Sequence, residues 1–319
     1  DDLNLKDDLL RGIYAYGFEI PSTIQKQAIC PIIRGVDLIA QAQSGSGKTG
    51  TFCISTLQRV DTQKCETQVL ILCPTRELVN QSMGVMTDIG RNISDLRVQK
   101  MIGGTSVRDS IRELKRPPHI VIGTIGRVLD MFQKRYLRGE QIKMLIIDEA
   151  DEMLSRGFCE QIKLMFEYYF KNDLQIVLFS ATMPPDVLTL TNKFMTNPER
   201  ILVKKEELSL QCIQQYFVAV LNDNMKYEKL KELFSAISVS KCIIYCNSIE
   251  RVINLYDAMK RDEFSICCIH SNMEKNDRSD ALRTFRDGDT RVLISSDITA
   301  RGIDIQQVST VINFDLTRS

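Results

Sequence analysis

The stretch that decides the fold runs from Asp37 to Arg59 and reads DLIAQAQSGSGKTGTFCISTLQR. The short apolar run Asp37–Ala40 predicts a buried strand, and Thr49–Arg59 predicts a helix. Between them, Ala42–Thr49 matches the phosphate-binding pattern A-x-x-x-x-G-K-T, with Ala in place of the usual first Gly. A plain Gly-rich turn is the alternative, but a strand before the loop and a helix after it favour nucleotide binding.

Each residue type in this loop has a task in phosphate binding. Glycines let successive backbone N–H groups converge on phosphate oxygens, and the positive end of the following helix dipole favours an anion. We expect Lys48 to supply a charge for the β- and γ-phosphates of ATP and the Thr49 hydroxyl to bind Mg²⁺. The other residues of the predicted cradle are Gln43, Ser44, Gly45, Ser46 and Gly47.

An acidic half of such a site follows the apolar run Met144–Ile147, which predicts another buried strand and leads into D-E-A-D. A carboxylate at the end of a strand beside a phosphate loop is placed to hold Mg²⁺, and we expect this of Asp148. Glu149 is expected to orient or deprotonate the attacking water. An acidic helix start would explain these residues in isolation, but the independent phosphate loop favours catalysis.

Short apolar runs alternate with amphipathic stretches along the whole chain. The first series of expected strands is Asp37–Ala40, Val69–Cys73, Val98–Ile102, Ile120–Gly123, Met144–Ile147 and Ile176–Phe179, with helices such as Arg76–Gly90 and Asp151–Tyr169. The second series is Gln214–Val220, Cys242–Asn247, Ile266–His270, Val292–Ser295 and Thr310–Phe314, with helices Ser248–Lys260 and Lys275–Phe285. This alternation predicts two α/β domains, each a doubly wound, mostly parallel sheet with helices on both faces. We place them at residues 1–203 and 212–319, joined by a charged linker at 204–211.

The composition excludes several other classes of protein. With 41 basic and 41 acidic residues the formal net charge is zero, which argues against nucleic-acid binding through bulk positive charge but leaves a local basic groove open. No apolar run reaches the ~18 residues of a membrane span, so no membrane is expected. Ten cysteines without a C-x-x-C pair, and only two histidines, cannot build zinc-finger spacing. Cysteines in apolar runs indicate a reducing, intracellular setting.

Further motifs point to a family. In chain order they are Gly17–Gln25 (GFEIPSTIQ), Pro74–Leu78 (PTREL), Gly103-Gly104, Asp148–Asp151 (DEAD), Ser180–Thr182 (SAT) and Ala300–Asp304 (ARGID). With them the chain resembles the DEAD-box RNA helicases over essentially its whole length, which implies two tandem RecA-like domains. Stretches such as LLRGIYAYGFE and DEADEMLSRGF resemble the translation initiation factor four-A branch, and NKFMTNPERILVK resembles its nuclear paralogue of exon junction complexes.

The resemblance implies nucleotide-binding and coupling roles beyond the phosphate loop. Gln25 would read the adenine edge, because an amide offers one donor and one acceptor, and Phe18 would stack on the base. Asp304 would bind the ribose, while Ser180 and Thr182 would couple the ATP site to RNA opening. Without the other motifs, Phe18 would be interpreted as a core residue and Gln25 as a helix-surface residue.

Three loops of the first domain and two strand ends of the second are implied to face RNA. Thr hydroxyls, Gly amides and Arg side chains position phosphates without reading sequence. The implied RNA-binding residues are Thr75, Arg76, Gly103, Gly104, Thr124, Gly126, Arg127, Asn247 and Ser296. The chain departs from the family pattern at two of these places. Ile125 replaces the usual Pro, so that loop loses a rigid φ but keeps its contact residues. Lys275–Arg278 stands where the family has Q-x-x-R, which alters that RNA contact.

We therefore expect an ATP-dependent RNA helicase that uses ATP and Mg²⁺, binds RNA independently of its sequence, and unwinds or remodels it locally in translation initiation. The alternative is an ATP-locked RNA clamp of an exon-junction or other RNA-processing complex with slow turnover. A DNA helicase or an unrelated P-loop ATPase is disfavoured by the PTREL, DEAD and SAT set. We expect a monomer with protein partners of initiation-factor or exon-junction type, located in the cytoplasm or, alternatively, the nucleus.

The sequence stops at Ser319 without the family's H-R-x-G-R-x-G-R motif, whose arginines reach the γ-phosphate. Arginines that contact the transferred phosphate accelerate phosphoryl transfer by ~10³–10⁵-fold. We therefore expect residues 1–319 to be a fragment that binds ATP through its first domain and hydrolyses it poorly.

Overall fold

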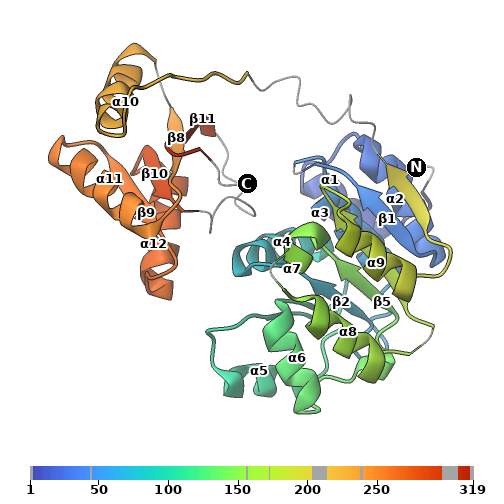
Figure 1. The fold of residues 1–319 in the computed structure, drawn as a ribbon. Coiled ribbons are helices and arrows are strands. Elements are labelled where there is room, and N and C mark those ends of the chain that lie inside the picture. The colour runs from blue at the N-terminus through green and yellow to red at the C-terminus, as the bar shows by residue number, and fades with distance from the viewer. Residues whose placement is uncertain are drawn as a thin grey trace. The chain divides into compact units, whose positions relative to one another are not determined.

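The chain divides into two compact units, Asp1–Gln211 and Cys212–Ser319 (Figure 1). The computed structural model describes residues 3–43, 45–155, 157–171, 173–202, 214–237, 240–296 and 308–316. The predicted linker at 204–211 lies outside these described residues. In the ranges that are described, no helix combines the length and the apolar content that crossing a membrane requires.

The N-terminal unit is one sheet of seven parallel strands with helices on both faces (Figure 1). Its strands are β1 (Leu38–Gln41), β2 (Val69–Leu72), β3 (Val98–Met101), β4 (Ile120–Gly123), β5 (Met144–Ile147), β6 (Gln175–Ser180) and β7 (Glu199–Leu202). Its helices are α1 (Asp7–Ala15), α2 (Thr23–Arg34), α3 (Lys48–Arg59), α4 (Arg76–Gly90), α5 (Val107–Leu114), α6 (Ile125–Gln133), η1 (Gly139–Gln141), α7 (Ala150–Ser155), α8 (Cys159–Tyr168) and α9 (Pro185–Phe194). The strand order is β3-β4-β2-β5-β6-β1-β7, and because the strands are parallel their carboxyl ends share one edge.

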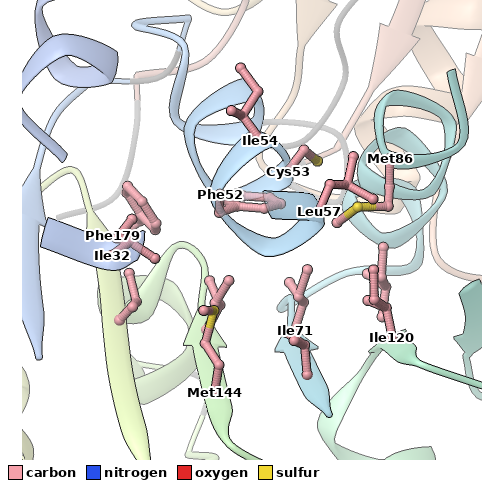
Figure 2. Packing of buried hydrophobic residues seen from close by; sticks show 14 of the residues in the cluster. Ile32, Phe52, Cys53, Ile54, Leu57, Ile71, Met86, Ile120, Met144 and Phe179 are labelled. Carbon is pink, nitrogen blue, oxygen red and sulfur yellow. The ribbon is translucent and has the colours of Figure 1, made fainter. Parts of the chain in front are cut away.

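Alternation along the strands fills a separate core on each face of this sheet. On one face of the sheet, helices α1 to α4 pack on strand residues such as Ile71 and Met144. On the other face, helices α6 to α9 pack on the strand residues that alternate with these along the chain. Figure 2 shows Phe52 and Leu57 of α3 lying between that helix and the strand residues Ile71 and Met144. Burying one such large side chain stabilises the fold by about 1.5–3 kcal/mol, so strands that are apolar on both faces are held firmly.

Two expectations for the N-terminal unit are corrected by the structure. The predicted helix Asp151–Tyr169 is two helices, α7 and α8, because Gly157 between them has a φ of +79°, which a helix cannot contain. The edge strand β7 was not predicted, since its residues are mostly exposed and form no apolar run. The helix Arg76–Gly90 has its predicted bounds, and the Thr75 hydroxyl caps it by accepting from the Leu78 N–H at 3.3 Å.

The C-terminal unit is a second parallel sheet with the order β11-β8-β10-β9. Its strands are β8 (Lys241–Tyr245), β9 (Ile266–Ile269), β10 (Val292–Ser295) and β11 (Val308–Asn313), and its helices are α10 (Asn224–Ala236), α11 (Ile249–Arg261) and α12 (Lys275–Asp287). Helices α10 and α11 pack on Cys242 and Ile244, and α12 packs on the other face.

The predicted strand Gln214–Val220 is wrong. These residues form neither helix nor strand, and the side chains of Tyr216 and Phe217 are exposed. An alternating apolar pattern becomes a strand only when a neighbouring strand supplies hydrogen bonds, and within the described residues none pairs with this segment.

Candidate active site at the carboxyl edge of the sheet

The phosphate loop joins β1 to α3 through two glycines in left-handed conformation. Gly45 and Gly47 have φ values of +81° and +99°, which other residues rarely adopt, and Gly47 is the residue that begins α3. The Ser46 hydroxyl and N–H both donate to the Gln43 carbonyl, at 2.7 and 3.3 Å, and close the loop into a turn. Ser44 lies outside the described residues. The first amides of α3 thus open at a site suited to an anion.

Lys48 and Glu149, which are 101 residues apart in sequence, form a buried ion pair at this edge. Lys48 Nζ lies 2.8 Å from Glu149 Oε1, and both side chains are almost fully buried. Glu149 has a φ of +48°, a left-handed conformation that costs a non-glycine residue about 1–2 kcal/mol. Backbone strain of this kind concentrates at functional sites, where the surrounding structure holds it in place.

Asp148, at the end of β5, is a carboxyl group with 2% of its surface exposed. Burial raises the pKa of Asp148 to about 7, against the attraction of Lys48 and with a further rise from the neighbouring Glu149. Its Oδ1 accepts the Glu149 N–H at 3.1 Å. A buried carboxylate and the Thr49 hydroxyl at the start of α3 are hard oxygen donors, the type that Mg²⁺ prefers, so these residues fit the ion.

Gln25 and Phe18 both contact the phosphate loop and the helix that follows it. Gln25 Oε1 accepts the Ser22 N–H at 2.8 Å in a capping box that begins α2, and its Nε2 donates to the Gly47 carbonyl at 3.5 Å. A Cβ on Gly50 would lie 2.8 Å from both Gln25 Nε2 and the Phe18 ring, so glycine lets these side chains approach α3. The role of Ser22 was missed, although the spacing S-x-x-Q signals a capping box.

The SAT residues are hydrogen-bonded to the helix that follows Glu149. The Thr182 hydroxyl donates to Asp151 Oδ2 at 2.7 Å, and the Asp151 N–H donates to the Ser180 hydroxyl at 3.2 Å. Ser180 in turn donates to the Thr182 carbonyl at 2.6 Å. The end of β6 and the start of α7 are therefore tied together, and Asp151 is the linking residue that sequence reasoning did not single out.

The loops predicted to face RNA follow β2, β3 and β4, at the same edge of the sheet. The Arg76 guanidinium lies against Gly103-Gly104, since a Cβ on Gly104 would be 2.7 Å from Arg76 Nη1. Thr75 is nearly buried as the cap of α4, whereas Thr124 begins α6 without using its hydroxyl as a cap. A Cβ on Gly126 would meet nothing within 4 Å, so that position is open to a ligand.

Arg127, a predicted RNA-binding residue, makes hydrogen bonds inside the N-terminal unit. Its side chain is only 8% exposed and donates to Thr105 Oγ1 (3.1 Å), the Thr105 carbonyl (2.7 Å) and Ser110 Oγ (2.7 Å). The guanidinium therefore donates these hydrogen bonds to the loop that follows Gly103-Gly104 and to α5. Arg127 therefore holds the loop that follows Gly103-Gly104 from inside the unit, and its contact with RNA phosphate stays a prediction.

We expect Arg127→Lys to lower both the stability of the N-terminal unit and its RNA affinity. Lysine cannot make three such hydrogen bonds in a fork, and each one lost to a charged donor costs about 1.5–3 kcal/mol. Arg112→Lys on α5 is the control, because its pair with Asp109 is exposed. Urea unfolding and RNA titration check this; equal behaviour of the two variants would contradict it.

In the C-terminal unit, the predicted RNA residues follow adjacent strands. Asn247 comes after β8 and Ser296 after β10, and both lie at the carboxyl edge of that sheet. Asp304, the expected ribose ligand, lies outside the described residues. The edge therefore brings together every described residue that was predicted from this unit.

A parallel sheet with a phosphate loop after β1 and an acidic pair after β5 is the arrangement of a P-loop nucleoside triphosphatase. The chain matches the model of the DEAD/DEAH box helicase over residues 22–190 and that of the helicase conserved C-terminal domain over residues 225–319. It therefore belongs to the DEAD-box helicases, as its motifs predicted.

Relatives and solved structures agree with this assignment. The chain is 50% identical over 316 residues to the ATP-dependent RNA helicase eIF4A of Chaetomium globosum, covering 99% of this chain and 79% of that protein. It is 50% identical over 316 residues to eukaryotic initiation factor 4A of Caenorhabditis elegans, covering 99% and 78%. Among structures, S. cerevisiae Dbp5 bound to RNA and ADP BeF3 matches with a TM-score of 0.90 at 30% identity, covering 99% of this chain and 80% of that one. A DEAD box protein from Methanococcus jannaschii matches at 0.62 and 32%, covering 99% and 85%.

Proposed function

We propose that this protein is an ATP-dependent RNA helicase that acts in translation initiation, in the cytoplasm, with partners of the initiation-factor type. The observation that carries the proposal is the meeting of Lys48, Asp148 and Glu149 at the sheet edge that also bears the RNA-type loops. The names of the relatives support the pathway, and the RNA-bound neighbour supports the class of ligand.

In the ATP half of the edge, this chain's residues have separable tasks. Lys48 would leave Glu149 for the β- and γ-phosphates, and Glu149 would then accept a proton from the attacking water. Thr49 and Asp148 would hold Mg²⁺, which when bound would neutralise phosphate charge. Gln25 and Phe18, already against the loop, would recognise the adenine base.

Coupling to RNA would pass through the bonds between Asp151, Ser180 and Thr182. A change in the position of Glu149 would be passed to α7, which begins at the next residue, and Asp151 in that helix is hydrogen-bonded to Ser180 and Thr182 at the end of β6. RNA would be held by the loops of Thr75, Arg76, Gly103-Gly104, Thr124 and Gly126, together with Asn247 and Ser296, through contacts to its backbone.

The test is RNA-stimulated ATP hydrolysis together with strand separation of a short duplex by the full-length protein. Stimulation by RNA and not by single-stranded DNA, with multiple turnovers, is expected. A single turnover followed by a long-lived complex with RNA would instead favour the ATP-locked clamp. Equal stimulation by DNA would contradict the assignment to RNA.

We expect RNA binding with a shallow salt dependence and a preference over DNA. On a single strand, the slope of log K against log salt is about −0.7 per phosphate neutralised. With Arg127 engaged inside the N-terminal unit, Arg76 is the cationic side chain that remains among the predicted RNA-binding residues, so a slope between about −1 and −2 is expected. Preference over DNA would come from the 2′-hydroxyl, which polar loops can reach. A salt titration with a non-hydrolysable ATP analogue checks this. A slope of −6 or steeper, which corresponds to roughly nine neutralised phosphates, would contradict it.

A further inference from the structure

One buried carboxylate joins the ends of β8 and β11 in the C-terminal unit. Asp315 accepts hydrogen bonds from the backbone N–H of Asn247 at 3.1 Å, from Arg251 Nε at 2.6 Å and from Lys226 Nζ at 3.0 Å. In the opposite direction, Asn247 Nδ2 donates to the Leu316 carbonyl at 2.5 Å. The turn after β8 is therefore tied twice to the segment after β11.

The charged cluster around Asp315 also contains Asp223, and both carboxylates pair with Arg251 and Lys226. The two carboxylates differ in their burial and in their other contacts. Asp223 receives Arg251 Nη1 and Nη2 at 2.6 and 2.9 Å and Lys226 at 2.8 Å, and its side chain is 57% exposed. The side chain of Asp315 is 7% exposed, and of the two it is the acid that contacts Asn247.

The ionised form of Asp315 is the one that this geometry stabilises. Burial by itself would raise the pKa of Asp315, but hydrogen bonds from the Asn247 N–H, Arg251 and Lys226 together hold that pKa below its ordinary value. A charged acceptor makes a stronger hydrogen bond to a backbone N–H than a neutral one does, so the Asn247 turn is held firmly at neutral pH.

We propose that Asp315 is a positioning residue for RNA binding, which fixes the turn after β8 so that Asn247 presents its side-chain amide to the RNA backbone. The inference rests on the proposed function, which assigns Asn247 to RNA. One amide hydrogen and the backbone N–H of Asn247 are already engaged, so the orientation of the amide is set before RNA arrives. Preorganisation of this kind removes an ordering cost from binding.

The experiment compares Asp315→Asn with Asp223→Asn in the full-length protein. Both variants remove one negative charge from the same cluster, so any general gain in attraction for phosphate is matched between them. We expect Asp315→Asn to raise the Kd for single-stranded RNA, measured with a non-hydrolysable ATP analogue, by about tenfold. Asp223→Asn should change that Kd by less than about threefold, since it removes only exposed ion pairs. Equal losses in the two variants would overturn the inference.

ATP turnover separates positioning from a loss of folded protein. In Asp315→Asn, the RNA concentration that half-maximally stimulates hydrolysis should rise by about the same factor, while kcat at saturating RNA stays unchanged. A fall in kcat with the half-saturating concentration unchanged would mean fewer folded molecules and would overturn the inference. Asp315→Glu, which keeps the charge, should recover part of the lost affinity even where Asp315→Asn folds poorly; no recovery counts against the inference.

A double-mutant cycle tests whether Asp315 acts through Asn247. In an Asn247→Ala background, adding Asp315→Asn should cause no further loss of RNA affinity, because the positioned group is already absent. Additive losses would overturn the inference and leave the proposed function intact. Absence of RNA binding by the unmutated protein would instead overturn the proposed function, and the inference with it.

Discussion

Replacing Glu149 with glutamine is expected to lower the rate of RNA-stimulated ATP hydrolysis by about 10²–10⁴-fold while ATP still binds. Glutamine has the same shape but cannot accept the proton of the attacking water. The buried pair adds a second expectation, because Lys48 lies 2.8 Å from Glu149 and must be released to meet phosphate. Removing the charge frees Lys48, so the Kd for ATP should stay the same or fall.

The measurement is hydrolysis at saturating ATP and RNA, with ATP affinity determined separately by a fluorescent analogue. Glu152→Gln is the matched control, since Glu152 is a similarly buried carboxyl group in α7, the helix that begins directly after Glu149, and has no assigned role in catalysis. It should keep a rate within about threefold of the unmutated protein. Hydrolysis by Glu149→Gln at the unmutated rate would show that another group activates the water.

Replacing Lys48 with alanine is expected to weaken ATP binding by about 100-fold or more, because charge-assisted hydrogen bonds to phosphate are worth about 1.5–3 kcal/mol each. The structure predicts a second effect on the fold. Alanine takes away the cationic partner of Glu149, and breaking a buried pair from one side costs about 3–5 kcal/mol. Thermal unfolding of the N-terminal unit should therefore occur at a lower temperature.

The double variant Lys48→Ala/Glu149→Gln separates these two effects. It removes both charges, so most of the lost stability should return, since a buried neutral amide costs much less free energy than a buried unpaired charge. ATP binding should not return, because no group replaces the lysine at the phosphates. Recovery of ATP affinity in the double variant would show that the loss in Lys48→Ala came from unfolding, and the phosphate role of Lys48 would be wrong.

The central strands, and the meeting of the residues predicted to bind the nucleotide at one edge, could be predicted because their signals are local. A buried parallel strand needs a continuous apolar run, and a carboxylate placed after it must fall at the shared edge. That rule alone brings Asp148 and Glu149 to the loop of Lys48. Gly157, which divides the predicted helix at residues 151–169, is also a local signal, because an isolated glycine in a helical pattern marks a candidate end.

The features that could not be predicted depend on partners that are distant in sequence. An arginine at a helix start looks the same whether it meets phosphate or an internal carbonyl, and the hydrogen bonds of Arg127 to Thr105 and Ser110 span 22 and 17 residues. The segment 214–220 has a strand-like pattern, but a pattern cannot supply the neighbour that a strand requires. The hydrogen bond between Asp315 and Asn247 spans 68 residues, and no sequence motif indicated it.

The order of strands in the N-terminal sheet divides the carboxyl edge of that sheet into two adjoining parts. Strands β1, β5 and β6, which carry groups predicted to bind ATP, are adjacent, and so are β2, β4 and β3, which carry the loops predicted to bind RNA. The border falls between β2 and β5, where the Asp148 N–H donates to the Leu72 carbonyl at 2.9 Å. Mutations can therefore change one part of the edge and leave the other part intact. Because loops tolerate substitution better than the strands that bear them, evolution can change the preferred nucleic acid through the three loops after β2, β3 and β4 and keep the ATP chemistry.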